Sequence, residues 1–394
     1  MQVANFDVAI IGGGPVGLIL ALGLAKQQRQ VCLIEKQPFQ KSTSFDGRAL
    51  ALTYGSVQLL KSLDIWQQLA EFTTPIKHVH ISQKGYLGLT KIHADEMNVE
   101  ALGYSVTASD LGSVLWQLVA ESALITLQTE TELSSFKVET EKVQLSLKDK
   151  NNQPQQQQAN LIIGADGTES KVRKLSGIKN NSKSYNAFGV LAKIETEQHP
   201  KGWSYERFTT EGPVALLPLG GHFHKAVMVV PTAKKEAIMA LNDDDYINLF
   251  AEKMGERLGE FTSISARVCY PLTESYAEKM VAERTLLIGN ASHTQHPVAA
   301  QGLNLGITDI KSFLALSTDE KDLGKASLLT QYQANQAPEH ERIMNFTDSL
   351  INVFEKESSL IGHLRGLGLM AMSAMPKSRH KLARMAMGVT SNGN

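Results

Sequence analysis

The sequence has very little cysteine, almost no net charge and no basic leader segment. Its two cysteines, Cys32 and Cys269, exclude the disulfide framework that is typical of small secreted domains. A net charge of −1 gives no electrostatic reason to expect nucleic acid as a partner. No basic segment precedes a cleavage site near the N-terminus, and this pattern favours a cytoplasmic protein.

Residues arranged to bind a metal are also scarce. His78 and His80 share one face of a predicted strand, but no third ligand follows at a suitable spacing, so we predict a half-exposed strand face and no metal site. Hydrophobic residues make up 42% of the chain and charged residues 20%, values typical of a globular protein with a sizeable core. A length of 394 residues favours two domains.

The most informative stretch is the glycine-rich turn Gly12-Gly13-Gly14-Pro15-Val16-Gly17. A β-branched segment, residues 6–11, precedes it, and an Ala- and Leu-rich helical segment, residues 18–26, follows. A second predicted strand, residues 31–34, ends at Glu35, which could accept hydrogen bonds from a ribose diol. Strand, glycine turn and helix in this order predict a dinucleotide site, because backbone N–H groups at the helix start attract a pyrophosphate.

The alternative interpretation of this stretch is a membrane span or signal segment, since residues 6–25 are largely apolar. Asp7 and the four-glycine turn with Pro15 argue against a span. A second strand that ends in an acid at the expected distance argues for the nucleotide site.

Two later segments have the same character. Residues 161–163 form a predicted buried strand that leads to Asp166 and Gly167, and Ser170 and Arg173 are spaced to begin a helix. Residues 284–288 lead in the same way to Gly289 and Asn290. A helix is then predicted from Gln301, and its free N–H groups at Gly302, Leu303 and Asn304 would favour a group that becomes negative when reduced.

The rest of the chain shows other residue patterns, which predict other kinds of secondary structure. Residues 47–63 predict a helix that begins beside Arg48, and the glutamine-rich run 151–158 predicts an exposed hairpin tip. Alternating segments in 179–271 predict a mostly antiparallel sheet. The Met-rich, basic end around Met370, Met372, Met375, Lys377, Arg379, Lys381 and Arg384 is compatible with contact to a membrane surface or partner, or with a helix packed on its own domain.

Taken together, these three motifs resemble the fingerprints of the class A FAD-dependent aromatic hydroxylases, in their order and separations along the whole chain. Three further features resemble the ubiquinone-biosynthesis branch of that class: residues 45–49, residues 205–209 with Gly212-Pro213 and Leu217-Pro218, and residues 348–350 before Phe354. The sequence departs from the wider class at Asn290, where aspartate is usual, at Ala300, where glycine is usual, and at Leu111, where relatives often carry arginine.

The resemblance implies an FAD held in extended form, with Glu35 at the adenosine ribose, the glycine turn and Arg48 near the pyrophosphate, and Gly289 and Asn290 at the ribityl chain. Pro297 and the helix start would lie against the isoalloxazine. The predicted cofactor-binding residues are Gly12, Gly14, Pro15, Val16, Gly17, Glu35, Lys36, Arg48, Asp166, Gly289, Asn290, Pro297, Gln301, Gly302, Leu303 and Asn304. Phe208, Pro218 and Pro297 are predicted walls of a substrate pocket, and no catalytic base is identified.

The implied fold is α/β: a Rossmann-like FAD-binding domain with a parallel sheet (1–75, 100–178 and 272–340), interleaved with a mostly antiparallel substrate domain (76–99 and 179–271), and a C-terminal helical region (341–394). The implied activity is hydroxylation of a polyprenylated phenol, 2-polyprenyl-6-methoxyphenol, to the 1,4-benzoquinol through a C4a-hydroperoxyflavin, with NADH or NADPH as transient electron donor and O2 as co-substrate. The alternatives are hydroxylation at another ring position and a non-catalytic flavin-bound scaffold. Peripheral contact with a membrane or biosynthetic complex, and a homo-oligomer, remain open.

Overall fold

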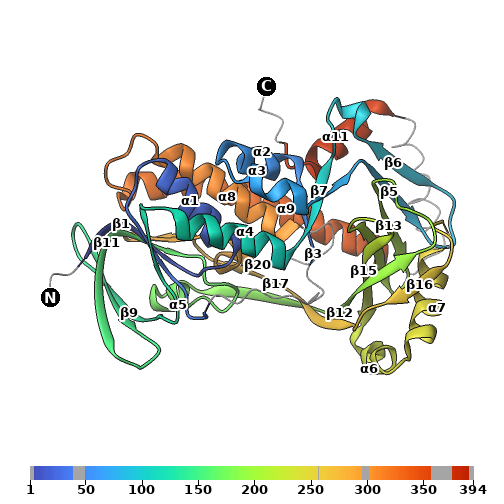
Figure 1. Cartoon of the computed structure of the whole chain (residues 1–394), viewed down its shortest axis with the longest axis horizontal. Coiled ribbons are helices and arrows are strands. Elements are labelled where there is room, and N and C mark those ends of the chain that lie inside the picture. The colour runs from blue at the N-terminus through green and yellow to red at the C-terminus, as the bar shows by residue number, and fades with distance from the viewer. Residues whose placement is uncertain (1–3, 39–48, 256, 295–300, 356–374, 390–394) are drawn as a thin grey trace.

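The computed structural model describes residues 4–38, 49–255, 257–294, 301–355 and 375–389. In Figure 1 a parallel sheet and its covering helices occupy one half of the molecule, and an antiparallel sheet with α6 and α7 occupies the other. The long strands β12 (Asn180–Thr196) and β17 (Val268–Ala277) run between the two halves. The predicted α/β fold class is therefore confirmed.

The parallel sheet is built around β1 (Asn5–Ile11), whose apolar residues are buried on both faces. Within the described residues the strand order is β18-β19-β11-β1-β2-β8, and β10 and β9 extend the sheet from β11 as antiparallel strands. The bounds are β2 Val31–Ile34, β8 Ile125–Gln128, β9 Glu132–Val138, β10 Val143–Lys148, β11 Pro154–Gly164, β18 Val281–Ala282 and β19 Thr285–Leu287. Because β1, β11 and β19 are parallel neighbours, their carboxyl ends lie at one edge of the sheet.

The predicted hairpin tip in the glutamine-rich run is only partly right. Gln155, Gln156, Gln157 and Gln158 belong to β11 and pair with β10, so the turn lies earlier, at residues 149–153. Backbone pairing with a neighbouring strand, which the local composition does not reveal, overrides the low strand propensity of glutamine.

Helices cover one face of the parallel sheet and enclose the largest apolar core. They are α1 (Pro15–Lys26), α4 (Ala108–Glu121), α8 (Gln301–Ser317) and α9 (Ala326–Glu355). Leu18, Leu115 and Phe313 are fully buried in this core. The contact of α1 with α8 brings the first glycine turn next to the start of a helix almost three hundred residues later.

The helix predicted over residues 47–63 is wrong in its first part. Residues 49–53 form strand β3 (Ala49–Thr53), which pairs with β7 (Gly103–Thr107), and the helix α2 (Tyr54–Ser62) begins only after it. The Thr53 side chain accepts a hydrogen bond from Ser56 N and so caps α2. Alternating Ala and Leu suit a helix locally, and pairing with a distant strand decides otherwise.

A nine-stranded, mostly antiparallel sheet fills the other half within the described ranges, with the order β20-β17-β12-β15-β14-β13-β5-β6 and β16 paired to β12. The remaining bounds are β5 His78–Gln83, β6 Leu89–His93, β13 Trp203–Thr209, β14 Gly212–Pro218, β15 Phe223–Pro231, β16 Phe261–Ile264 and β20 His293–Thr294. Helices α6 (Lys235–Met239) and α7 (Asp243–Met254) pack on one face through Val214, Leu216, Tyr246 and Phe250. We call this the helix-covered face and the opposite one the open face.

Smaller elements complete the described chain. These are β4 Thr74–Ile76, α3 Trp66–Leu69 and short turns of 3₁₀ helix at Ala70–Phe72, Asp95–Met97, Thr232–Lys234 and Gly289–Ala291. The C-terminal helix α11 (Pro376–Ala386) packs on its own chain: Ala383 and Met387 join Ile92 in a small apolar cluster, and Arg379 pairs with Glu96 at 3.0 Å. Met370 and Met372 lie outside the described residues. Among the helices within those ranges, none is long and apolar enough to cross a bilayer.

Candidate functional site

The glycines of the turn after β1 differ in whether the fold leaves room for a side chain at their position. Gly12 has φ +115°, and a Cβ there would lie 2.9 Å from Asp166 Cα, while a Cβ on Gly17 would collide with the Gly12 carbonyl oxygen. These two glycines are therefore needed by the fold itself. Gly14 is the N-cap of α1 with φ −75°, Pro15 is the first helical residue, and a Cβ on Gly14 would meet no atom within 4 Å. Open space in front of a helix N-terminus is what an anionic ligand requires.

Glu35 lies beside this turn at the end of β2, as predicted. One carboxylate oxygen accepts a hydrogen bond from Gly13 N at 2.5 Å and the other from Gln37 N at 2.7 Å. Trp116 of α4, which the sequence analysis did not select, lies so close that a Cβ on Gly13 would be 2.9 Å from its ring. Lys36 extends to the surface and pairs with Glu132 of β9 at 3.5 Å.

Asp166 follows β11 and lies directly against the glycine turn. One carboxylate oxygen accepts from Lys171 N at 2.7 Å and Val172 N at 3.2 Å, so it caps α5 (Lys171–Leu175). The other oxygen, Oδ1, is buried and has no hydrogen-bond partner among the described residues. A buried acceptor without a partner is costly, and a ligand hydroxyl would satisfy it.

Arg173 ties the second motif to the third. Its buried guanidinium donates to Ala291 O at 2.8 Å and to Thr168 O at 2.7 Å, and Ser170 caps its helix by accepting from Arg173 N at 3.0 Å. The spacing of Ser170 and Arg173 predicts a helix start here, but no local pattern predicts this bridge. The guanidinium therefore links the turn after β11 to the turn after β19.

Gly289 and Asn290 follow β19 in the third motif. Gly289 has φ +56° and lies against Val16 of the first motif, since a Cβ there would be 3.1 Å from the valine side chain. Asn290 is exposed, so its amide is available to a ligand. The carboxyl ends of β1, β11 and β19 thus bring all three motifs together, as the sequence analysis predicted.

The start of α8 completes the site. Gly302 has no atom within 4 Å of an added Cβ, and its N–H belongs to the first helical turn, where intrahelical acceptors are lacking. Asn304 has a structural role: its side chain accepts from Thr53 N at 2.9 Å and Ser56 Oγ at 2.7 Å and donates to Ala51 O at 2.7 Å. Its side chain is therefore engaged within the protein, and the predicted ligand contact would have to involve its backbone. The neighbouring Leu303 is partly exposed.

These observations fit an extended dinucleotide such as FAD. Open space at Gly14 and Gly302 and an acceptor without a partner at Asp166 lie on three segments that converge. The predicted contacts of Arg48 and Pro297 lie outside the described residues, as does Ala300, and of Gln301 only the backbone is described. Leu111 is fully buried in the core, so it takes no part in the site.

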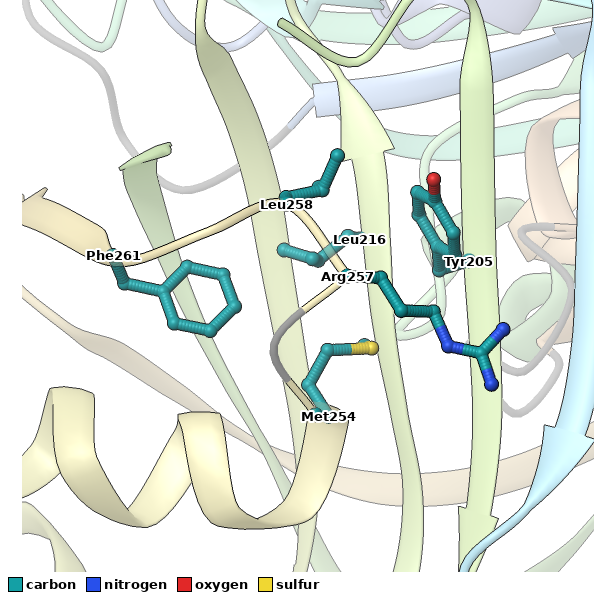
Figure 2. Close-up of a pocket in the computed structure, with 7 residues that line it drawn as sticks. Tyr205, Leu216, Met254, Arg257, Leu258 and Phe261 are labelled. Atoms are coloured by element: carbon teal, nitrogen blue, oxygen red, sulfur yellow. The ribbon is translucent and has the colours of Figure 1, made fainter. Parts of the chain in front are cut away.

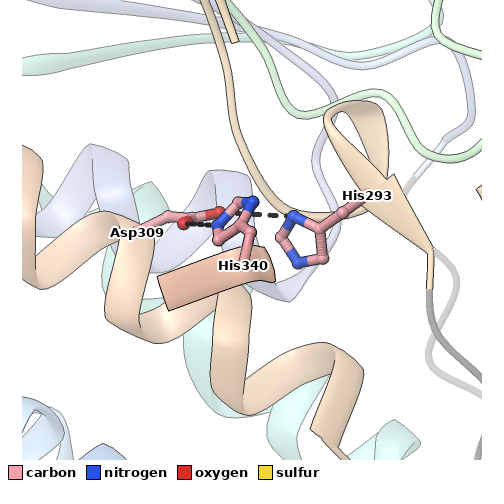
Figure 3. Close-up of side chains that lie close together, drawn as sticks. All are labelled: His293, Asp309 and His340. Atoms are coloured by element: carbon pink, nitrogen blue, oxygen red, sulfur yellow. Dashed lines mark hydrogen bonds and ion pairs between the residues drawn. The ribbon is translucent and has the colours of Figure 1, made fainter. Parts of the chain in front are cut away.

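A buried cluster of His293, Asp309 and His340 lies behind the third motif (Figure 3). His340 Nε2 is 2.7 Å from Asp309 Oδ1, and Asp309 Oδ2 accepts from Gly289 N at 3.1 Å and lies 3.7 Å from His293 Nδ1. A separation of 2.7 Å is that of a charge-assisted hydrogen bond, so we interpret the cluster as a network that supports the Gly289 turn. The three residues belong to β20, α8 and α9, so no local sequence pattern groups them.

The burial of His293 predicts acid sensitivity. Desolvation lowers the pKa of His293 to about 3, whereas an unfolded histidine has a pKa of about 6.5. The unfolded chain binds this proton first, so stability is complete above pH 6.5 and falls as the pH decreases toward 3. We expect a loss of about 2 kcal/mol between pH 7 and pH 5 from this group.

Urea unfolding at several pH values tests this expectation. His293→Gln should reduce the slope between pH 7 and pH 5, and the rest of the slope comes from His80 and His224, whose pKa values burial also lowers to about 4. The same change at the exposed His199 should leave the slope as in the parent protein. Equal slopes for all three proteins would contradict the assignment.

The two predicted pocket walls do not share a face of the antiparallel sheet. Phe208 of β13 pairs with Pro213, while Pro218 lies by strand alternation on the side of Val214 and Leu216, the helix-covered face. The cavity in Figure 2 also lies on that face, beside the end of α7. Its lining residues are Tyr205, Leu216, Met254, Gly255, Arg257, Leu258 and Phe261.

The open face adjoins the convergent motifs. Lys225 of β15 donates from Nζ to Ala49 O of β3 at 2.6 Å, and Asn304 at the start of α8 donates to Ala51 O of the same strand. The open face and the first turn of α8 are therefore joined through one short strand. The cavity of Figure 2 lies on the opposite, helix-covered face.

Comparison with known proteins gives consistent matches over almost the whole chain. The model of a family described as FAD binding domain matches residues 5–347. An uncharacterized protein of Synechocystis, slr1300, is 30% identical over 98% of this chain and 94% of its own, and the 3-demethoxyubiquinol 3-hydroxylase of Escherichia coli is 29% identical over 97% and 98%. The crystal structure of p-nitrophenol 4-monooxygenase PnpA from Pseudomonas putida superposes with a TM-score of 0.80 at 13% identity, covering all of both chains.

Proposed function

Since this chain belongs to the FAD binding domain family and is an FAD-dependent monooxygenase, we propose that it hydroxylates the ring of a polyprenylated phenol in ubiquinone biosynthesis. The substrate proposed is 2-polyprenyl-6-methoxyphenol and the product its 1,4-benzoquinol. The observation that carries the proposal is the convergence of three motifs at open glycines beside the half-buried, mostly apolar open face of the sheet. A ring with an apolar chain suits such a surface.

The chain would contribute binding, orientation and electrostatics, while bound FAD supplies the redox chemistry that takes electrons from NADH or NADPH and transfers one oxygen atom from O2. The N-termini of α1 and α8 direct N–H dipoles toward the sites proposed for the pyrophosphate and for the flavin ring. The amide of Asn290 and the carboxylate of Asp166 would orient hydroxyl groups of the cofactor.

Product analysis tests the substrate. Purified protein with FAD, reduced nicotinamide, O2 and a short-chain 2-prenyl-6-methoxyphenol should form the para-hydroxylated quinol, with nicotinamide oxidation accelerated by the phenol. Peroxide release that the phenol does not alter, without quinol, would contradict the proposal. The same assay with the phenol that lacks its prenyl chain measures how much the apolar face contributes to substrate binding and turnover.

A second candidate is hydroxylation at another ring position, and the name of the Escherichia coli relative favours it. The same assay distinguishes the two, because the product isomers separate by chromatography and mass fragmentation. A non-catalytic flavin-bound scaffold would instead give no flavin reduction by either nicotinamide with any phenol of the series.

A further inference from the structure

Glu206, in the middle of β13, lies on the open face of the antiparallel sheet. Its neighbour Tyr205 packs on the helix-covered face with Leu216, and successive residues of a strand point to opposite faces. Glu206 is directly opposite Ala215 of β14 and next to Ile81 of β5. Ala215 pairs with Val227, which pairs with Leu191.

Glu206 is an acid surrounded by apolar side chains, because its cross-strand neighbours on the open face are all apolar. All of its named neighbours, Ile81, Ala215, Val227 and Leu191, are half-buried, so no packed layer covers them within the described residues. The Glu206 carboxylate makes no hydrogen bond or ion pair with any residue that the structure describes. A carboxylate that is partly removed from water and has no partner costs free energy, and such costs are characteristic of functional sites.

The other charged residues on the open face have partners of their own. Lys225 donates to Ala49 O, the Lys193 ammonium lies 3.8 Å from the centre of the Phe223 ring, and Glu195 accepts from Ser263 Oγ at 2.9 Å. The facing strand β3 carries no charged residue. Glu206 is thus the one acid of this face, within the described ranges, that no neighbour neutralises or binds.

We propose that Glu206 is a catalytic residue whose carboxylate accepts a hydrogen bond from the phenolic hydroxyl of the substrate. This inference rests on the proposed function and names the contact by which the open face recognises the phenol. The O–H proton moves to the carboxylate, the electron pair stays on the phenolic oxygen, and the ring becomes more electron-rich where it takes up the oxygen atom. Once the new C–O bond has formed, that ring carbon loses its hydrogen as a proton, and the phenolic oxygen takes its own proton back from the carboxylate.

The environment of Glu206 supports this role. Burial raises the pKa of its carboxyl to about 7, while part of its side chain remains accessible to solvent, as in a concave surface. A general base is most effective when its pKa is near the working pH. Tyr205, the preceding residue of β13, points to the opposite face and lines the cavity of Figure 2, so it cannot contact a ligand bound at Glu206.

The test compares Glu206→Gln with Glu195→Gln, an acid of the same face that bonds only Ser263. Binding of a short-chain 2-prenyl-6-methoxyphenol is measured from the absorbance change of bound FAD between pH 5.5 and 9, and turnover from quinol formation. We expect Glu206→Gln to retain FAD, to lower kcat/KM about 100-fold, and to lose the inflection near pH 7 in phenol binding. Glu195→Gln should behave as the parent protein.

The outcomes separate this inference from the proposed function. If the parent protein forms quinol and Glu206→Gln matches it in kcat/KM and in pH profile, the role of Glu206 is wrong while the function stands. A purely structural glutamate would show itself by a higher melting temperature in the glutamine variant with unchanged phenol binding. If the parent protein forms no quinol, the proposed function fails, and loss of pH-dependent phenol binding in the variant still decides the role of Glu206.

Discussion

Replacing Gly14 by valine should yield a colourless protein that is still folded. Gly14 has φ −75°, which any residue adopts, and a Cβ there meets no protein atom within 4 Å, so the fold does not need glycine at this position. The side chain would instead enter the space in front of α1, where the N–H groups are proposed to bind the pyrophosphate. Loss of two charge-assisted hydrogen bonds corresponds to about 3 kcal/mol or more, a decrease in FAD affinity of at least about 100-fold.

The measurements are FAD content after purification, FAD affinity by fluorescence titration, and the melting temperature of the cofactor-free protein. The last should be unchanged in Gly14→Val. Gly17→Ala is the matched contrast, because its Cβ would collide with the Gly12 carbonyl oxygen and should reduce both folding and FAD binding. Lys26→Ala, at the exposed end of the same helix, should alter neither. A Gly14→Val protein that keeps its yellow colour would refute the role assigned to this turn.

Replacing Asp309 by alanine should cause the largest loss of stability. The carboxylate is completely buried and binds His340 and the backbone N–H of Gly289, so its removal leaves these two polar groups without their partner in the core. Breaking a buried charged network costs about 3–5 kcal/mol. For a chain of this size the melting temperature should fall by about 4–6 °C.

A double-mutant cycle tests whether the effect belongs to the network. Asp309→Asn keeps an acceptor for Gly289, and His340→Gln keeps a donor for Asp309, so each should be milder than Asp309→Ala. Because the two residues are in direct contact, their effects on the free energy of unfolding should differ from additivity by about 1 kcal/mol or more. Additive effects, or a melting temperature of Asp309→Ala equal to that of the parent protein, would contradict the network. FAD affinity should fall with stability, since Gly289 lies against Val16 of the first motif.

Neighbouring residues encode the features of this protein that could be predicted without coordinates. The turn from Gly12 to Gly17, the acid at Glu35 and the later pairs at Asp166 and Gly289 were recognisable because tight turns and helix starts impose requirements at fixed spacing. The alternation of the antiparallel strands was recognisable because side chains alternate between two faces. These local rules led to the family that the comparisons show.

Contacts between residues far apart in the chain could not be predicted and are known from the folded structure alone. Strand β3 replaced a predicted helix because its partner β7 lies some fifty residues away in the chain. Arg173 bridges two motifs, Asp309 lies between His293 and His340, and Glu206 rather than Pro218 shares a face with Phe208. The physical reason is that burial, sheet register and the pairing of polar groups depend on contacts between segments far apart in sequence, and local composition carries no record of them.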